Sequence, residues 1–222
     1  MKRRNFIAAL TAASLGAAIE GPFTELARGQ DTSRASARSQ RRAAVGSEFS
    51  ENAAIVLVHG AWADGSCWSN VILPLERRGL KVICAPIPLT TLTDDTTALS
   101  WALERTSGPV VLVGHGYSGA VIAAVREERI KSLVYVTALA PDEGETVAKV
   151  FYRDTPSPEQ PKMVPDSRGL VWMPEDAFRR ALAQNATANQ ARIAAAVQRP
   201  IGVQCIKERR PRRYGNLYRR GI

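Results

Sequence analysis

Short apolar runs alternate with helical patterns over residues 53–137. Ile55–Val58 and Val110–Val113 are continuous runs of Val, Ile and Leu before glycine-containing turns, as in strands that are buried on both faces. The apolar spacing predicts further strands over 80–85 and 132–137, and helices over 68–78, 96–105 and 119–128. This alternation predicts an α/β fold, with a mostly parallel sheet and helices on both of its faces.

The pattern changes beyond Ala140. Residues 153–174 are rich in proline and irregular, and they precede two predicted helices over 174–184 and 187–197. Two interpretations fit these helices. They form a helical lid, spanning about 141–200, over one edge of the sheet, or they are surface helices that complete the α/β layers.

The first residues have the order of an export signal. A basic start, Lys2–Arg4, precedes the apolar stretch Phe6–Ala18, which is shorter than the ~20 residues that cross a bilayer as a helix. The order Arg-Arg-x-Phe-Ile resembles a twin-arginine signal, so we expect residues 1–20 to direct export to the periplasm or beyond. The alternative is a basic start followed by an amphipathic helix. Residues 21–52 are polar and lack apolar periodicity, which predicts a disordered linker.

Charge changes this picture only at the two ends. The formal net charge is +9, but residues 1–45 carry +5 and residues 207–222 carry +6, which leaves −2 for 46–206. A nearly neutral body gives no electrostatic footprint for nucleic acid. The cysteines and histidines have no metal-ligand spacing, so we expect neither a metal nor a cofactor.

Two sequence motifs follow the predicted strands at 55–58 and 110–113, at the sheet edge where ligands bind in parallel α/β sheets. The segments VLVHGAWADGSCW (56–68) and VLVGHGYSGA (111–120) resemble the α/β-hydrolase fold family. Within that family they are most similar to the small esterase and hydroxynitrile-lyase-like branch, which carries HGAW and GHSYGG. The resemblance covers roughly residues 53–205.

The resemblance implies an oxyanion hole made of two backbone N–H groups. One would come from Ala61 or Trp62, and the other from Tyr117, which follows the nucleophile position. The remaining motif residues are His59, Gly60, Gly114 and His115. Taken alone, His59-Gly60 is also a common strand end with a turn glycine.

The sequence departs from the family pattern at the nucleophile. In ungapped register the position of the catalytic serine is Gly116, so the attacking hydroxyl is absent. A shifted register, Gly116-Tyr117-Ser118-Gly119-Ala120, would make Ser118 an alternative nucleophile. The family order places the acid and the histidine after the serine, whereas His59 and His115 both precede residue 116.

These observations predict an ester-hydrolase-type homologue that is incomplete at the C-terminus and catalytically inactive. The domain is expected over 53–206, with a basic, non-homologous tail over 207–222. The alternatives are an active serine esterase that uses Ser118 and a non-catalytic small-molecule-binding module. The expected partner is a small ester or acyl-like molecule, with no nucleic acid and no stable membrane span.

Overall fold

The computed structural model describes residues 52–153 and 160–211. Their main sheet is parallel, in the order β2–β1–β3–β4, and is made of Ala54–Val58 (β1), Lys81–Ala85 (β2), Val110–His115 (β3) and Ile130–Val136 (β4). Val56 of β1 is in register with Ile83 and with Leu112. The α/β fold expected from the alternating pattern is confirmed, and each predicted strand forms.

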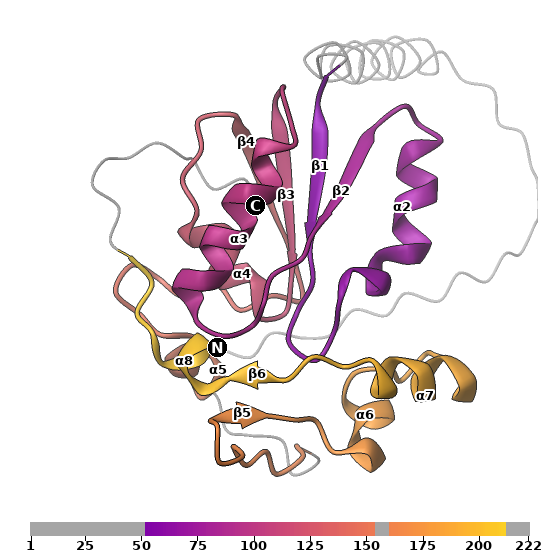
Figure 1. The fold of residues 1–222 in the computed structure, drawn as a ribbon, viewed down its shortest axis with the longest axis vertical. Coiled ribbons are helices and arrows are strands. Elements are labelled where there is room, and N and C mark those ends of the chain that lie inside the picture. The colour runs from indigo at the N-terminus through magenta and orange to yellow at the C-terminus, as the bar shows by residue number, and fades with distance from the viewer. Residues whose placement is uncertain (1–51, 154–159, 212–222) are drawn as a thin grey trace, which may run out of the picture. The chain divides into compact units, whose positions relative to one another are not determined.

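Helices connect the strands and cover the sheet. The connections contain the 3₁₀ helix η1 (Gly65–Trp68) and the helices α2 (Ser69–Glu76), α3 (Leu92–Glu104) and α4 (Ser118–Ala124). Figure 1 shows α2 beside β2, while α3 and α4, which contact each other, lie together on the other side of the view. The side chains of Val56, Leu99 and Leu112 are fully buried between these layers.

Two helix boundaries differ from the prediction. Helix α3 begins at Leu92 rather than near 96, because the Thr91 hydroxyl caps the Asp94 N–H at 2.9 Å. Helix α4 ends at Ala124 rather than at 128, because the backbone of Val125 is extended. Local capping and backbone geometry decide both ends, and apolar spacing does not report them.

The segment after β4 lies across the carboxyl ends of the parallel strands (Figure 1). It contains α5 (Val147–Phe151), β5 (Leu170–Val171), α6 (Glu175–Ala181), α7 (Ala188–Ala196), β6 (Ile201–Gly202) and α8 (Val203–Lys207). Strands β5 and β6 are antiparallel. Helices α6 and α7 correspond to the two predicted helices, whereas α5, α8 and the two short strands were not predicted. Below, "lid" means residues 160–202.

The C-terminal boundary predicted at 206 falls inside α8. Residues beyond it pack on the domain: Arg209 forms an antiparallel bridge with Thr146, and Arg210 is 5% exposed and donates to the Pro141 carbonyl at 2.7 Å. The predicted signal (1–20), nearly all of the linker (21–52) and most of the tail lie outside the described residues.

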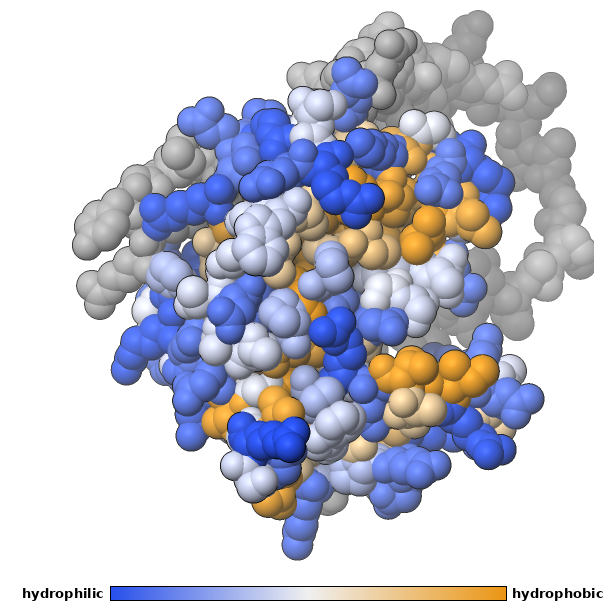
Figure 2. All heavy atoms as spheres, in the orientation of Figure 1, coloured by the Kyte–Doolittle hydropathy of each residue, from blue (hydrophilic) through white to orange (hydrophobic). Residues whose placement is uncertain are grey.

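The surface of the described residues is mixed. Figure 2 shows polar residues over most of the face in view, with apolar residues in separate patches. Within the described ranges, no helix is both long enough and apolar enough to span a bilayer.

Candidate active site

Two backbone turns at the carboxyl ends of β1 and β3 form the floor of the site. The first runs from His59 to Trp62. His59 is 1% exposed, its Nδ1 lies 3.0 Å from the Gly60 carbonyl, and burial lowers its pKa. The Trp62 backbone has φ 58°, which is unusual for a large side chain.

Gly60 allows this turn to approach the second one. A Cβ atom at Gly60 would lie 2.9 Å from the His115 carbonyl oxygen, so a side chain there would push the turns apart. The motif glycine therefore has a packing reason as well as its place in the turn.

The second turn joins β3 to α4 through Gly116. Its φ of 58° lies in the left-handed region, and its N–H and carbonyl bond to β4 and the following loop: Val136 O at 3.3 Å and Leu139 N at 2.8 Å. A Cβ at Gly116 would find no heavy atom nearer than the Gly60 Cα, at 3.9 Å. This sharp strand-to-helix turn, called the elbow below, has space for a side chain at Gly116 but carries no hydroxyl there.

Ser118 lies on the sheet side of this turn. It is 0% exposed, and its Oγ accepts from the His115 N–H at 2.8 Å. The single proton of this hydroxyl has two carbonyl oxygens within reach, that of Val58 at 2.8 Å and that of His115 at 2.9 Å. The hydroxyl therefore joins the ends of β1 and β3, and Ser118 does not line the cavity described next.

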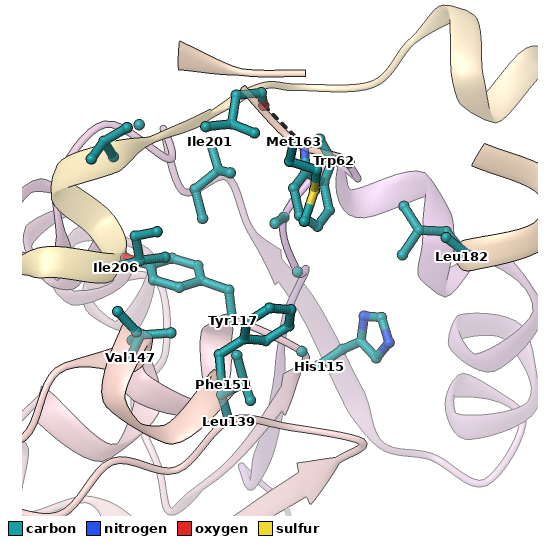
Figure 3. Close-up of a pocket in the computed structure, with 18 of the residues that line it drawn as sticks. Trp62, His115, Tyr117, Leu139, Val147, Phe151, Met163, Leu182, Ile201 and Ile206 are labelled. Atoms are coloured by element: carbon teal, nitrogen blue, oxygen red, sulfur yellow. Dashed lines mark hydrogen bonds between the residues drawn. The ribbon is translucent and has the colours of Figure 1, made fainter. Parts of the chain in front are cut away.

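A cavity of about 730 Å³ lies above the two turns. Its wall is mostly apolar and comes from both turns, α5, α8 and the lid (Figure 3). The residues labelled in the figure are Trp62, His115, Tyr117, Leu139, Val147, Phe151, Met163, Leu182, Ile201 and Ile206. A volume of this size accommodates a small organic molecule.

Three residues at the floor of this cavity have backbone N–H groups without a backbone acceptor in the described part of the chain. The N–H groups of Ala61, Trp62 and Tyr117 donate to no backbone carbonyl among the described residues. Ala61, Trp62 and Tyr117 all line the cavity together with Gly116. The structure therefore brings together the residues proposed for the oxyanion hole and the position proposed for the nucleophile, and it leaves Ser118 outside this group.

His115 is the imidazole on the cavity wall. Its ring meets Trp68 edge to face, with centroids 6.3 Å apart, and burial lowers its pKa. Both histidines of the chain therefore favour the neutral form at neutral pH. Within the described ranges, no group of three or more His, Cys, Asp or Glu side chains could hold a metal ion.

The lid is tied to the floor through Trp62. Its indole N–H donates to the Val171 carbonyl of β5 at 2.9 Å, across 109 positions of the sequence. The indole packs against the main core and also against the small lid core around Met173 and Phe178. The HGAW motif predicted a role for the Trp62 backbone but carries no signal for this side-chain contact.

Comparisons with known proteins match this description. The model of the Alpha/beta hydrolase family matches residues 55–218, past the predicted boundary at 206. A carbendazim hydrolyzing esterase from Nocardioides sp. (strain SG-4G) is 30% identical over 119 residues, which are 46% of this chain and 48% of that protein. The chain spans about half or less of the length of the curated relatives it matches.

Solved structures agree at the level of the fold. A pyrethroid hydrolase superposes with a TM-score of 0.60 at 20% identity, covering 72% of both chains. An extracellular alpha/beta-hydrolase from a Paenibacillus species superposes with a TM-score of 0.57 at 21% identity, covering 71% of this chain and 70% of that one.

Proposed function

The chain belongs to the alpha/beta hydrolase family, and from this we propose that it is an ester-hydrolase-type protein that binds small ester or acyl-like molecules without serine catalysis. The observation that carries this proposal is Gly116. It occupies the apex of the elbow, with φ 58°, beside the free N–H groups and the apolar cavity. The site can therefore accept a carbonyl compound but offers it no attacking hydroxyl.

The composition of the cavity supports a small, mainly apolar ligand. Aromatic and aliphatic side chains form most of the wall, and the N–H groups at its floor can receive a carbonyl oxygen. Two relatives are named as a carbendazim hydrolyzing esterase and a pyrethroid hydrolase, which is consistent with ligands of this class.

The absence of serine catalysis rests on two further observations. Ser118 uses its hydroxyl in hydrogen bonds to Val58 and His115 at zero exposure. His59 and His115 are the two histidines of the sequence, and both precede the elbow. Within residues 1–222, no histidine follows position 116, where the order of this fold normally places the base.

The test separates binding from covalent chemistry. We expect benzyl butyrate to raise the melting temperature of the protein in a dose-dependent way, because a ligand of the folded state stabilises it. We expect a serine-directed fluorophosphonate to leave the protein unlabelled. Labelling of the wild-type protein that is lost in Ser118→Ala would refute the proposal and indicate an active esterase that uses Ser118. Absence of any thermal shift would refute ligand binding.

Export remains a separate proposal, because the signal lies outside the described residues. We expect residues 1–52 to carry a folded reporter into the periplasm of a bacterium with a twin-arginine pathway. The double change Arg3→Lys with Arg4→Lys should abolish this transport. Equal export of both versions, measured by cell fractionation, would refute the twin-arginine interpretation.

A further inference from the structure

A buried carboxylate lies directly behind the cavity floor. Asp95, in the first turn of α3, is 0% exposed, and its two oxygens accept from three different segments. Oδ1 accepts from the Leu89 N–H at 2.6 Å, and Oδ2 accepts from the Tyr117 hydroxyl at 2.7 Å. The Cys205 thiol of α8 is the third donor, with its sulfur 3.6 Å from Oδ2.

All three partners present donors to this side chain. A carboxylate has only acceptors, so Asp95 can satisfy them together, whereas an amide would have to turn an N–H toward one of them. Burial raises the pKa of Asp95, while the hydrogen bonds from Tyr117, Leu89 and Cys205 act in the opposite direction. Burying a carboxyl group costs free energy unless hydrogen-bond partners compensate for the lost water. Here all three donors supply that compensation.

The cluster joins the elbow to the element that returns from the lid. The Leu89 carbonyl accepts from the Gly202 N–H of β6 at 2.8 Å, and Leu89 itself has φ 63°. A Cβ at Gly202 would lie 2.4 Å from the Thr90 carbonyl, so β6 can approach this closely only with glycine. Asp95 therefore fixes the loop on which β6 rests as well as the ring of Tyr117.

Tyr117 connects Asp95 to the cavity, because it bonds to Asp95 and lines the cavity. Its ring lines the cavity, and Figure 3 shows it on the same side as Ile206 of α8. Its backbone N–H belongs to the residue that follows Gly116 and is one of the free donors at the floor. Ring and N–H belong to one residue that is 3% exposed, so close packing leaves the ring little room to move independently of the backbone turn.

We infer that Asp95 is a positioning residue of the cavity, which holds the Tyr117 ring and N–H in their ligand-facing placement and joins them to β6 and α8. The part of this inference that concerns ligand affinity rests on the proposed function. The placement of Tyr117 can be measured in the ligand-free protein, so that part is independent of the proposed function.

The experiment compares two buried hydrogen-bonding residues, Asp95 in the first turn of α3 and Thr106 just beyond its C-terminal end. Asp95→Asn keeps the size of the side chain but replaces one acceptor oxygen with an NH₂ group, which disrupts at least one of the three bonds. Thr106→Val is the matched control, because Thr106 is 6% exposed, bonds to the Leu103 carbonyl at 2.6 Å and does not line the cavity. Selective ¹⁵N-tyrosine labelling follows the amides of the five tyrosines, and Tyr117→Phe identifies the Tyr117 signal by removing it.

We expect Asp95→Asn to shift the Tyr117 amide signal and to weaken benzyl butyrate binding about three- to tenfold, the loss typical of one hydrogen bond. Tyr117→Phe should weaken binding to a similar extent, and the double variant should be no weaker than either single one. Thr106→Val should lower the melting temperature and change neither the Tyr117 signal nor the affinity.

The outcomes are distinguishable. If Asp95→Asn lowers only the melting temperature, as Thr106→Val does, Asp95 is structural and the inference is wrong. If the wild-type protein binds no benzyl butyrate, the proposed function fails, and the Tyr117 amide signal still decides the role of Asp95. If Asp95→Asn does not fold, Tyr117→Phe supplies the test, and unchanged affinity in that variant overturns the inference.

Discussion

The floor and the lid of the cavity differ in the size of the hydrophobic cluster that supports them. The floor rests on the main cluster, in which Val56, Leu99 and Leu112 are fully buried. The lid has a small cluster of its own, centred on Met173 and Phe178. The sheet core therefore holds the turns of the site in place, whereas the lid depends on a few contacts with the floor.

The largest expected effect is on the core beneath the floor. Leu112→Ala should lower the free energy of unfolding by about 2–5 kcal/mol, because it leaves a cavity among fully buried side chains. The lid variant Phe178→Ala should shift the global denaturant midpoint less and should instead speed proteolysis within 160–202. Equal midpoint shifts in urea unfolding would show that floor and lid unfold as one unit.

The next effect concerns the strained turn of the floor. Gly116→Ser should cost about 1–3 kcal/mol because a side chain is placed at positive φ. Gly79→Ser is the matched control, since Gly79 has φ 78° and open space around it, outside the cavity. Both variants should lose similar stability, and neither should hydrolyse para-nitrophenyl butyrate above background. A burst of product from Gly116→Ser would show that the chain supplies a base after all.

Ser118 tests the connection between the two strands of the floor. Ser118→Ala should lower the free energy of unfolding by about 1–2 kcal/mol, because it leaves the His115 N–H without its buried acceptor. Affinity for benzyl butyrate should change little, since the hydroxyl does not line the cavity. Ser100→Ala, at an exposed hydroxyl on α3, should change neither quantity and serves as the control.

The contact between floor and lid predicts a smaller, local effect. Trp62→Phe removes the indole N–H that bonds to Val171 and should destabilise the lid by about 0.5–1.5 kcal/mol. Hydrogen exchange should become faster in β5 and β6, while exchange in β1 and β3 stays slow. Trp101→Phe, at a side chain that is 64% exposed, is the control. Uniform acceleration in both regions would contradict a local role for Trp62.

The smallest expected effect is a pH dependence of the floor. Burial lowers the pKa of His59 and His115 below 6.5, so the unfolded chain binds more protons than the folded one as the pH falls. The stability from these groups is full above pH 6.5 and is lost as the pH falls toward the lowered folded-state values. His115→Gln should flatten this decline in urea unfolding, because all other titrating groups are unchanged. An equally steep decline in that variant would show that groups other than His115 cause the pH dependence.

The sequence predicted the floor better than the lid, for physical reasons. β1 and β3 could be predicted because runs such as Val110–Val113 are buried on both faces, and the turn after β3 follows from the length of that run. The positive φ at Gly116 fits that register, and the shifted one would have required it elsewhere.

The parts that could not be predicted depend on contacts between distant residues. Strands β5 and β6 have two residues each and exist through their pairing with one another. The bond from Trp62 to Val171 and the burial of Asp95 likewise have no local signal, since an acidic residue in a first helical turn is usually solvated. The start of α3 could have been found from Thr91, a capping residue that apolar spacing alone ignores.

Strand β4 ends the order of the main sheet within the described residues, and its Val134 and Val136 are 39% and 37% exposed. An apolar strand at such an edge is a template for another chain. Two molecules must meet before their β4 edges can pair. The initial rate of aggregation by this route should therefore rise with the square of the protein concentration. The working lifetime of a sample should therefore depend on how concentrated it is, and dilution should extend it.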